Sequence, residues 1–310
     1  MCKDAKVISV LASINVDLVV EVEHFPKPGE TIKSDGIEKH FGGKGANQAI
    51  AARRVGAKVN ILGKVGQDEL GKEYISHFNE NDISTNNILC SDNKSTGQAI
   101  INIDKNGENN IIVVSGANSE LSNEDVDVFC EKLEETDVAI SQFEVPLNVT
   151  EKFLKLAKEK KCITVLNPAP AQKIPESLNS YVDILIPNEN ELKMITDHEV
   201  DTMEQIEQAA RDIIQNGIPY IIVTLGENGT LIVSDTESLH IPAKKVHAID
   251  TTAAGDTFIG AFSYKMAEAK EINMYTLKES AEFATKASAL TVQKKGAQAS
   301  IPYMKDIVEL

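Results

Sequence analysis

The chain has 310 residues, of which 42% are hydrophobic and 25% are charged, an ordinary composition for a globular protein. Its formal net charge of −16 argues against non-specific binding to nucleic acid or to an anionic membrane surface, because both depend on excess lysine and arginine. The four cysteines show no paired spacing, and no apolar run is long enough for a membrane span or a signal peptide. We therefore expect a cytoplasmic protein with reduced thiols.

Buried strands and amphipathic helices are predicted to alternate along most of the chain. Strands are expected at 6–13, 58–66, 138–144, 162–168, 182–188, 220–226 and 244–249, and helices at 46–57, 68–81, 149–161, 189–196, 202–217 and 257–266. Strands built from continuous Val, Ile and Leu are typical of parallel sheets with helices on both faces. The alternation predicts one doubly wound α/β domain over residues 1–310, with a mainly parallel sheet.

Three segments depart from this rhythm. Residues 16–22 and 96–104 alternate between apolar and polar side chains, and residues 111–115 follow a turn. They predict a small antiparallel β-sheet whose strands are inserted at about 15–40 and 95–116. From the pattern alone, this sheet is either a lid over a binding site or an extension of the main sheet.

Polar residues follow nearly every predicted strand, where open parallel sheets bind their ligands. They are Asn15, Asp17, Glu144, Asn167, Asn188, Glu191, Thr224, Gly226, Asp250 and Asp256. A single polar residue at a strand end would mean little, since loops are polar. A set at almost every strand end predicts one extended cleft.

Four short motifs bear on whether this cleft binds a ligand. In FGGKGANQA (41–49), glycines let the backbone approach a ligand closely. Asn47 either bonds a ligand hydroxyl or caps the following helix, and capping is favoured for an isolated asparagine. NENE (188–191) matches a capping box, and TLGENG (224–229) suits a hairpin turn or a loop over a nucleotide. GQDELGKE (66–73) has P-loop spacing, but Glu73 stands where Ser or Thr is required.

The stretch DTTAAGDTF (250–258) combines small residues with a predicted helix start. Such a helix end offers unpaired N–H groups and a partial positive charge, which can stabilise a phosphoryl group in transfer. Asp256, in the first turn, would then suit a base that removes a proton from an attacking hydroxyl. The alternative is an ordinary capped helix, which the motif alone slightly favours.

Together these strings resemble the ribokinase family of sugar kinases (pfkB-type carbohydrate kinases) along almost the whole chain. The strings are SINVD (13–17), FPKPGET (25–31), FGGKGANQA, STG (95–97), LNPAPA (166–171), PNENE (187–191), TLG (224–226), DTTAAGDTF and KKGAQASIP (294–302). AAGD is specific to the superfamily. FGGKGANQA together with LNPAPA points to the members that act on D-ribose.

The resemblance implies ATP-dependent phosphorylation of D-ribose at O5 to D-ribose 5-phosphate, with Mg²⁺ and K⁺ as further cofactors. It implies a doubly wound domain with a β-sheet lid, through which two copies form a homodimer. It assigns the base to Asp256 and an anion hole to the backbone of Ala253, Ala254 and Gly255.

The remaining roles are also carried over from the resemblance. Sugar contacts are implied for Asn15, Asp17, Gly43, Lys44, Gly45, Asn47, Glu144 and Asp256. The nucleotide side is implied for Asn188, Thr224, Gly226, Gly229, Gly255 and Thr285. Glu191 would organise magnesium through water, and a monovalent cation would lie at Asp250, Thr252, Thr291, Lys294, Gly296 and Ser300.

Two positions depart from the family pattern. Thr285 stands where some relatives have a histidine against the adenine, and Lys294 stands where others have an arginine. They leave nucleotide preference and cation affinity open.

Other functions remain as alternatives to ribose phosphorylation. The same fold could act on deoxyribose, a nucleoside or a hexose derivative, or could be a non-catalytic sugar- or nucleotide-binding regulator, against which Asp256 argues. A nicotinamide-dependent dehydrogenase lacks support, because no GxGxxG follows the first strand.

Overall fold

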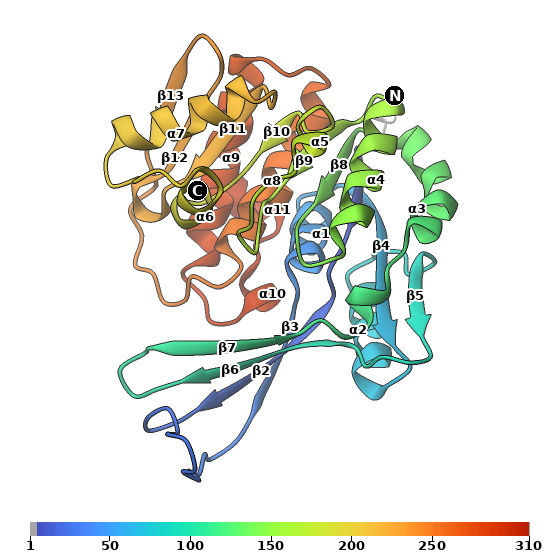
Figure 1. The fold of residues 1–310 in the computed structure, drawn as a ribbon, viewed down its shortest axis with the longest axis vertical. Coiled ribbons are helices and arrows are strands. Elements are labelled where there is room, and N and C mark those ends of the chain that lie inside the picture. Colours follow the sequence, from blue (N-terminus) through green and yellow to red (C-terminus); the bar gives the residue numbers. More distant parts are fainter. Residues whose placement is uncertain (1–4, 310) are drawn as a thin grey trace.

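The computed structural model describes residues 5–309 and divides their strands between two sheets (Figure 1). The larger sheet has nine strands in the order β13 (Ser238–Ile241), β12 (Thr230–Val233), β11 (Tyr220–Thr224), β10 (Ile184–Leu185), β9 (Ile163–Leu166), β8 (Val138–Ser141), β1 (Val7–Leu11), β4 (Lys58–Gly66) and β5 (Ile88–Ser91). Neighbouring strands run parallel except where β12 pairs with β11 and β13. The predicted mainly parallel sheet is confirmed.

Helices cover both faces of this sheet. One face carries α1 (Lys44–Arg54), α2 (Glu69–Glu80), α8 (Ala254–Ala269), α9 (Met274–Thr291) and α11 (Met304–Val308). The other carries α3 (Asn123–Phe129), α4 (Leu147–Glu159), α5 (Glu176–Asn179), α6 (Glu189–Thr196) and α7 (Met203–Gln215). Shorter pieces are α10 (Ala297–Ser300) and the 3₁₀ helices η1 (Gly116–Glu120), η2 (Cys130–Glu135) and η3 (Gly226–Asn228).

The strands are apolar on both sides because they serve two separate cores. Ile8 on β1 lies beside Val59 on β4 and Val138 on β8 in the sheet register, and all three belong to the core under α1, α8 and α9. Leu11 and Ala139 point to the second core, under α4 and α7. Continuous apolar strands are therefore the expected sequence signature of this layered fold.

The smaller sheet has four strands, in the order β3 (Glu38–Gly42), β2 (Asn15–Glu21), β6 (Gly97–Ile103) and β7 (Asn109–Val114). The two outer pairs are antiparallel, as predicted, whereas the central pair of β2 and β6 runs parallel. The sheet projects from the main body below α10 (Figure 1). Asn15 pairs with both Gly42 and Gly97, so three of its strands meet the main body at one place.

The strand predicted at 244–249 is wrong. The last strand, β13, ends at Ile241, and residues 242–253 belong to no strand. Instead, the backbone N–H groups of Ile249 and Asp250 both donate to the carbonyl of Val292, just after α9. This segment therefore bonds to a helix end rather than to a neighbouring strand.

Two further observations concern the described residues. Within residues 5–309, no helix has the length and apolar character needed to cross a membrane. Cys90, Cys130 and Cys162 are free, and Cys2 lies outside the described part of the chain.

Helices α1 and α8 lie close together at Gly260. A Cβ atom at Gly260 would lie 2.6 Å from the carbonyl oxygen of Gln48 and 2.6 Å from the Cβ of Ala51. Only a residue without a side chain allows this approach. The contact sets how Asp256, one turn earlier on α8, faces α1.

We expect Gly260→Ala to lower the free energy of unfolding by about 1–3 kcal/mol, because the added methyl group overpacks the crossing of α1 and α8. Gly255→Ala is the matched control, since it lies in the same helix and its Cβ would meet nothing within 4 Å. The control is expected to be as stable as the unmodified chain, within about 0.5 kcal/mol. Urea unfolding of both variants tests this, and equal stabilities would contradict the role given to Gly260.

Candidate active site

Asp256 is a buried carboxylate, 8% exposed, in the first turn of α8. Its Oδ2 accepts a hydrogen bond from Asn47 Nδ2 at 2.9 Å, and its Oδ1 accepts one from Gln48 Nε2 at 3.0 Å. The favoured interpretation of Asn47 as a helix cap is wrong. Helix α1 already begins at Lys44, so Asn47 lies inside it and its side chain is free to turn towards Asp256.

Burial raises the pKa of Asp256 above its ordinary value, while the Lys44 ammonium and the two amides oppose the rise. A desolvated carboxylate that keeps its charge only through a few fixed donors accepts a proton readily. The chemistry expected of Asp256 from the sequence is therefore compatible with its surroundings.

No side chain caps helix α8. Ala253 precedes it in the left-handed conformation, with φ 62° and ψ 9°, and forms no side-chain hydrogen bond to the helix. The N–H of Ala254 donates to the carbonyl of Thr251 at 3.2 Å, which closes a tight turn. A Cβ on Gly255 would meet nothing within 4 Å, so this helix end faces open space. The interpretation as an ordinary capped helix is therefore not supported.

A cavity of about 190 Å³ opens at this helix end. It is lined by Lys44, Asn167, Ile186, Asn188, Glu191, Thr224, Thr251, Ala253, Ala254, Gly255, Asp256 and Ile259. These residues come from the carboxyl ends of β9, β10 and β11 and from the amino ends of α1, α6 and α8. Five of the predicted strand-end residues, Asn167, Asn188, Glu191, Thr224 and Asp256, are thus brought together. The other five, Asn15, Asp17, Glu144, Gly226 and Asp250, do not line this cavity.

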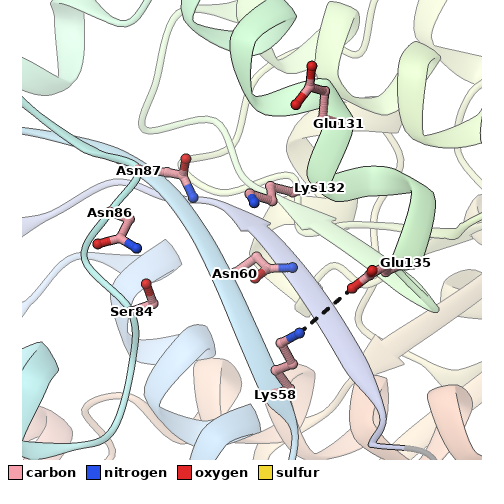
Figure 2. Close-up of a pocket in the computed structure, with 8 residues that line it drawn as sticks. All are labelled: Lys58, Asn60, Ser84, Asn86, Asn87, Glu131, Lys132 and Glu135. Atoms are coloured by element: carbon pink, nitrogen blue, oxygen red, sulfur yellow. Dashed lines mark ion pairs between the residues drawn. The ribbon is translucent and has the colours of Figure 1, made fainter.

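A second cavity, of about 380 Å³, lies at the opposite end of the sheet, where β4 begins (Figure 2). Its lining residues are Lys58, Asn60, Ser84, Asn86, Asn87, Glu131, Lys132 and Glu135, with an ion pair of 3.7 Å between Lys58 and Glu135. None of the predicted site residues lies there. Its two lysines and two glutamates balance each other in charge, so it offers no strong field to a charged ligand.

The residues expected to contact a sugar lie where the small sheet meets the main body. Glu144 Oε2 accepts hydrogen bonds from Ser13 Oγ at 2.6 Å and from the backbone N–H of Lys44 at 3.0 Å. Asn15 Oδ1 accepts one from Asn118 Nδ2 at 2.8 Å. These bonds hold the ends of β1 and β8 and the start of α1 together.

Glycines make this close meeting possible. Gly43 has φ 89°, and a Cβ there would lie 2.7 Å from the backbone nitrogen of Asn15. A Cβ on Gly45 would lie 2.4 Å from the Cα of Ala12. The glycines of FGGKGANQA therefore let α1 begin directly against the end of β1.

Asp17, on β2 of the small sheet, completes a concentration of negative charge. Its pKa is raised to about 7, mainly by burial and also by the carboxylates of Glu144 and Asp256, while Lys44 opposes the rise. Burial disfavours the charged form of Lys44, but the surrounding carboxylates, Asp256 first, hold its pKa above the ordinary value. Lys44 is thus the cation on which several acidic groups depend.

On the other side of the cavity, Asn188 and Glu191 form the predicted capping box at the start of α6. Asn188 Oδ1 accepts from the backbone N–H of Glu191 at 2.8 Å, and Glu191 Oε2 accepts from that of Asn188 at 2.9 Å. Burial raises the pKa of Glu191, and the N–H of Asn188 and the charge of Lys44 oppose this. Both residues line the cavity, so capping and contact with a ligand are compatible here.

The remaining nucleotide-side residues are more scattered. Thr224 lines the cavity, and its N–H donates to the carbonyl of Pro187 at 2.9 Å. Gly226 and Gly229 lie in the turn between β11 and β12, which confirms the hairpin, but they do not line the cavity. Thr285, buried on α9, also lies outside the lining, and its Oγ1 has no partner among residues 5–309.

The residues expected to hold a monovalent cation lie in two adjoining segments, 250–252 and 291–300. Asp250 accepts hydrogen bonds from the backbone N–H groups of Thr252 at 2.9 Å and Gly296 at 2.8 Å. Burial raises the pKa of Asp250, but these bonds outweigh it and the pKa lies below its ordinary value. The carbonyl of Thr291 accepts from Lys294 N–H at 3.2 Å, and Ser300 Oγ donates to the carbonyl of Ala297 at 2.7 Å.

Several buried polar residues of the site were not predicted from the sequence. They are Gln48, Asn118, Gln142 and Gln298, each no more than 3% exposed. Gln48 and Gln298 lie inside motifs that had been noted, and Gln142 lies in the predicted strand before Glu144. A long amide among small or apolar residues needs a buried partner, and that was the available signal.

Comparisons with known proteins place the whole chain in one family. The family model described as pfkB family carbohydrate kinase matches residues 5–304. Ribokinase from Staphylococcus aureus (strain COL) is 40% identical over 299 residues, covering 96% of this chain and 97% of that protein. Deoxyribokinase from Salmonella typhi is 36% identical over 303 residues, covering 97% of each chain.

A solved structure agrees with these sequence matches. Arabidopsis thaliana ribokinase complexed with ribose and ATP superposes with a TM-score of 0.90 at 31% identity, and 98% of each chain is covered. The identity is spread along the whole chain, as is the structural likeness. The chain therefore belongs to the pfkB family of carbohydrate kinases.

Proposed function

We propose that this chain transfers the γ-phosphoryl group of ATP to O5 of D-ribose and releases D-ribose 5-phosphate and ADP. The observation that carries the proposal is Asp256, a buried carboxylate beside an open helix end at the cavity. The relatives named ribokinase, and the ribokinase solved with ribose and ATP, support ribose and ATP as substrates.

Asp256 is the base in this proposal. As O5 of the sugar forms its bond to the γ-phosphorus, Asp256 takes the hydroxyl proton, and the bond between that phosphorus and the bridging oxygen of ADP breaks. The turn of Ala253, Ala254 and Gly255 lets the backbone at the start of α8 face the group in transfer and stabilise its charge. Lys44 lies at the same cavity and adds a positive charge.

The sugar would bind between the small sheet and the main body. Asn15, Asp17, Asn47, Glu144 and the turn of Gly43, Lys44 and Gly45 supply both donors and acceptors, which a polyol needs because each hydroxyl donates and accepts. Asp17 lies on the small sheet, so this sheet acts as a lid that brings part of the site with it. We propose that lid and main body form one domain over residues 1–310.

The nucleotide would lie along Asn188, Thr224, Gly226, Gly229 and Gly255, with Thr285 near its adenine ring. The unpaired Oγ1 of Thr285 is a buried hydroxyl that a ligand could satisfy.

The cavity suits magnesium that is held mainly by phosphate and water. Glu191 and Asp256 are the only carboxylates in its lining, and no group of three or more acidic, histidine or cysteine side chains is arranged to hold a metal within residues 5–309. Mg²⁺ commonly needs just one or two carboxylates besides phosphate. Bound there, it would neutralise phosphate charge, and Glu191 would orient its water ligands.

The loops at Asp250 suit a monovalent cation, because their available groups are oxygens. Asp250 and Thr252 face the segment from Thr291 to Ser300, whose carbonyls and hydroxyl complete an oxygen-only set. The Lys294 side chain is exposed, so this residue would contribute its carbonyl. We assign potassium to this place because hard cations take oxygen ligands.

The exposed face of the lid fits a second copy of the chain. Strand β7 is at the edge of its sheet, and its apolar side chains, Ile111 to Val114, are between 41% and 58% exposed. An edge strand with this character is usually covered. We propose that two lids pair in a homodimer.

A second candidate substrate is 2-deoxyribose, favoured by the match to a deoxyribokinase at 36% identity. The two sugars differ only in the hydroxyl at C2.

Release of ADP across a panel of sugars tests the proposed reaction. We expect ribose to give the highest kcat/KM, and Asp256→Asn to lose at least about 100-fold in kcat while ribose still binds in calorimetry, because the base is gone and the shape is kept. Asp201→Asn, at an exposed position, is the charge-matched control. Preferred turnover of deoxyribose or a nucleoside would overturn the substrate, and near-normal turnover of Asp256→Asn would overturn the base.

Asp17 is expected to make the ligand-free protein less stable as pH rises. Its folded-state pKa of about 7 exceeds the ordinary 3.8, so the stability it contributes below the unfolded pKa is lost as pH increases towards about 7. We therefore expect Asp17→Asn to unfold at a higher temperature than the unmodified chain above pH 7, with a difference that shrinks on acidification. Thermal unfolding across pH measures this, and parallel curves for the two proteins would count against it.

Potassium is expected to raise the rate above that in sodium buffer of equal ionic strength, because the oxygen set at Asp250 needs a cation to hold its loops against α8. Asp250→Ala should remove the preference for potassium. The measurement is initial rate against salt concentration at saturating ribose and ATP. Identical rates in both salts would contradict the proposed site.

A further inference from the structure

We infer that Gln298 is a positioning residue for the catalytic base, because it fixes the amide of Asn47 that donates to Asp256. The inference rests on the proposed function, in which Asp256 is the base. Gln298 does not line the cavity and so acts through Asn47 rather than on the substrate.

The orientation of the amides follows from the carboxylate. Asp256 at the centre can only accept, so Asn47 must direct its Nδ2 towards it, at 2.9 Å. The Oδ1 of Asn47 then points away and accepts from Gln298 Nε2, also at 2.9 Å. If Asn47 turned over, its oxygen would face a carboxylate oxygen, and two acceptors would repel each other.

Gln298 is itself held on several sides. It is 3% exposed, on the short helix α10, and its Nε2 also donates to the Tyr74 hydroxyl at 2.7 Å. The Tyr74 hydroxyl donates onward to the carbonyl of Gly42 at 2.5 Å. The Oε1 of Gln298 lies 2.7 Å from His77 Nε2, which must therefore carry a proton. With both ends of its amide engaged, Gln298 cannot turn over without breaking these bonds.

The other oxygen of Asp256 has a parallel arrangement that is less firmly held. Gln48 Nε2 donates to it, and Gln48 Oε1 accepts from Gln142 Nε2 at 2.7 Å. The Oε1 of Gln142, however, is buried without a partner among residues 5–309. The hydrogen bonds that run from Gln298 through Asn47 to Asp256 are thus fixed by the fold. Those that run from Gln142 through Gln48 offer a second test of whether a buried amide positions Asp256.

Charged and titratable groups surround Asp256. They are Lys44 on α1, Asp17 on β2, Tyr74 on α2, Glu144 after β8 and Glu191 on α6. Only Tyr74 among them bonds Gln298, and the substitution Gln298→Met adds no charge. A difference between Gln298→Met and the unmodified enzyme therefore reports the loss of the amide.

The test is the pH profile of kcat/KM for ribose in the full-length enzyme carrying Gln298→Met or Gln298→Glu. Methionine keeps the length of the side chain but cannot donate, so Asn47 is released. The donated hydrogen bond to Asp256 weakens, and the acid limb of the profile moves to higher pH by about half a unit or more. Gln208→Met is the control, because this exposed glutamine on α7 donates its Nε2 to Asp212 Oδ1 at 2.9 Å and does not line the cavity.

Gln298→Glu separates positioning from simple packing. An ionised glutamate has almost the same shape but can only accept, so it draws the Asn47 nitrogen to itself and turns the Asn47 oxygen towards Asp256. We expect this variant to be less active at alkaline pH than Gln298→Met. A purely structural role predicts the reverse order, with the acid limb unmoved in Gln298→Met, and that result would overturn the inference.

Two further measurements separate the possible failures. If Gln298 variants keep the acid limb of the unmodified enzyme while Asp256→Asn is inactive, only this inference fails; if Asp256→Asn stays active, the proposed function fails. Thermal unfolding reports whether each variant folds. If Gln298→Met does not fold, Gln142→Met makes the same test through Gln48. An unmoved acid limb in Gln142→Met would then overturn the inference that such amides position Asp256.

Discussion

Burial of the Asp256 carboxylate against two amide donors is the interaction on which the rest of the site depends. A charged carboxylate away from water is costly unless fixed donors replace the water it has lost. Asn47 and Gln48 supply these donors from consecutive positions of α1. They can do so only because Gly260 lets α8 approach α1 closely and Gly45 lets α1 begin directly against β1. The glycines thus place Asp256 as much as the side chains that touch it.

Negative charge is concentrated around one cation. Asp17, Glu144, Glu191 and Asp256 all influence Lys44, and the pKa values of Asp17, Glu191 and Asp256 are raised. Such a site is not at its most stable when empty, which is common where chemistry needs groups with shifted pKa values. A polyol offers hydroxyl donors to these acceptors, and magnesium would offset the charge of the phosphates. Stability and activity are therefore expected to oppose each other here.

Much of the fold could be predicted because its signals are local. Continuous apolar strands and helix-period patterns determined the layered sheet, and the capping box of Asn188 and Glu191 was read directly from four residues. The prediction of a strand at 244–249 was wrong because the sequence there resembles a strand end. The group that this segment bonds, the carbonyl of Val292, is distant in the chain. The interpretation of Asn47 as a helix cap was wrong for a similar reason, because the carboxylate that Asn47 bonds lies 209 residues away.

The network also joins two parts of the molecule that the sequence left separate. Helix α10 is a single turn that follows Gly296, whose N–H bonds Asp250, and it carries Gln298, which bonds Asn47. A cation held beside Asp250 would therefore act on the same short helix whose Gln298 bonds the side-chain amide of Asn47. The segment around Gly296 is thus joined by hydrogen bonds to both Asp250 and Asn47.

The most direct measurement is a crystal structure of this chain with ribose and a non-hydrolysable ATP analogue. The account predicts ribose O5 within hydrogen-bond distance of an Asp256 carboxylate oxygen, with the γ-phosphate of the analogue against the backbone of Ala253 to Gly255. Ribose bound with O5 away from Asp256, or bound in the cavity lined by Lys58 and Glu135, would contradict it.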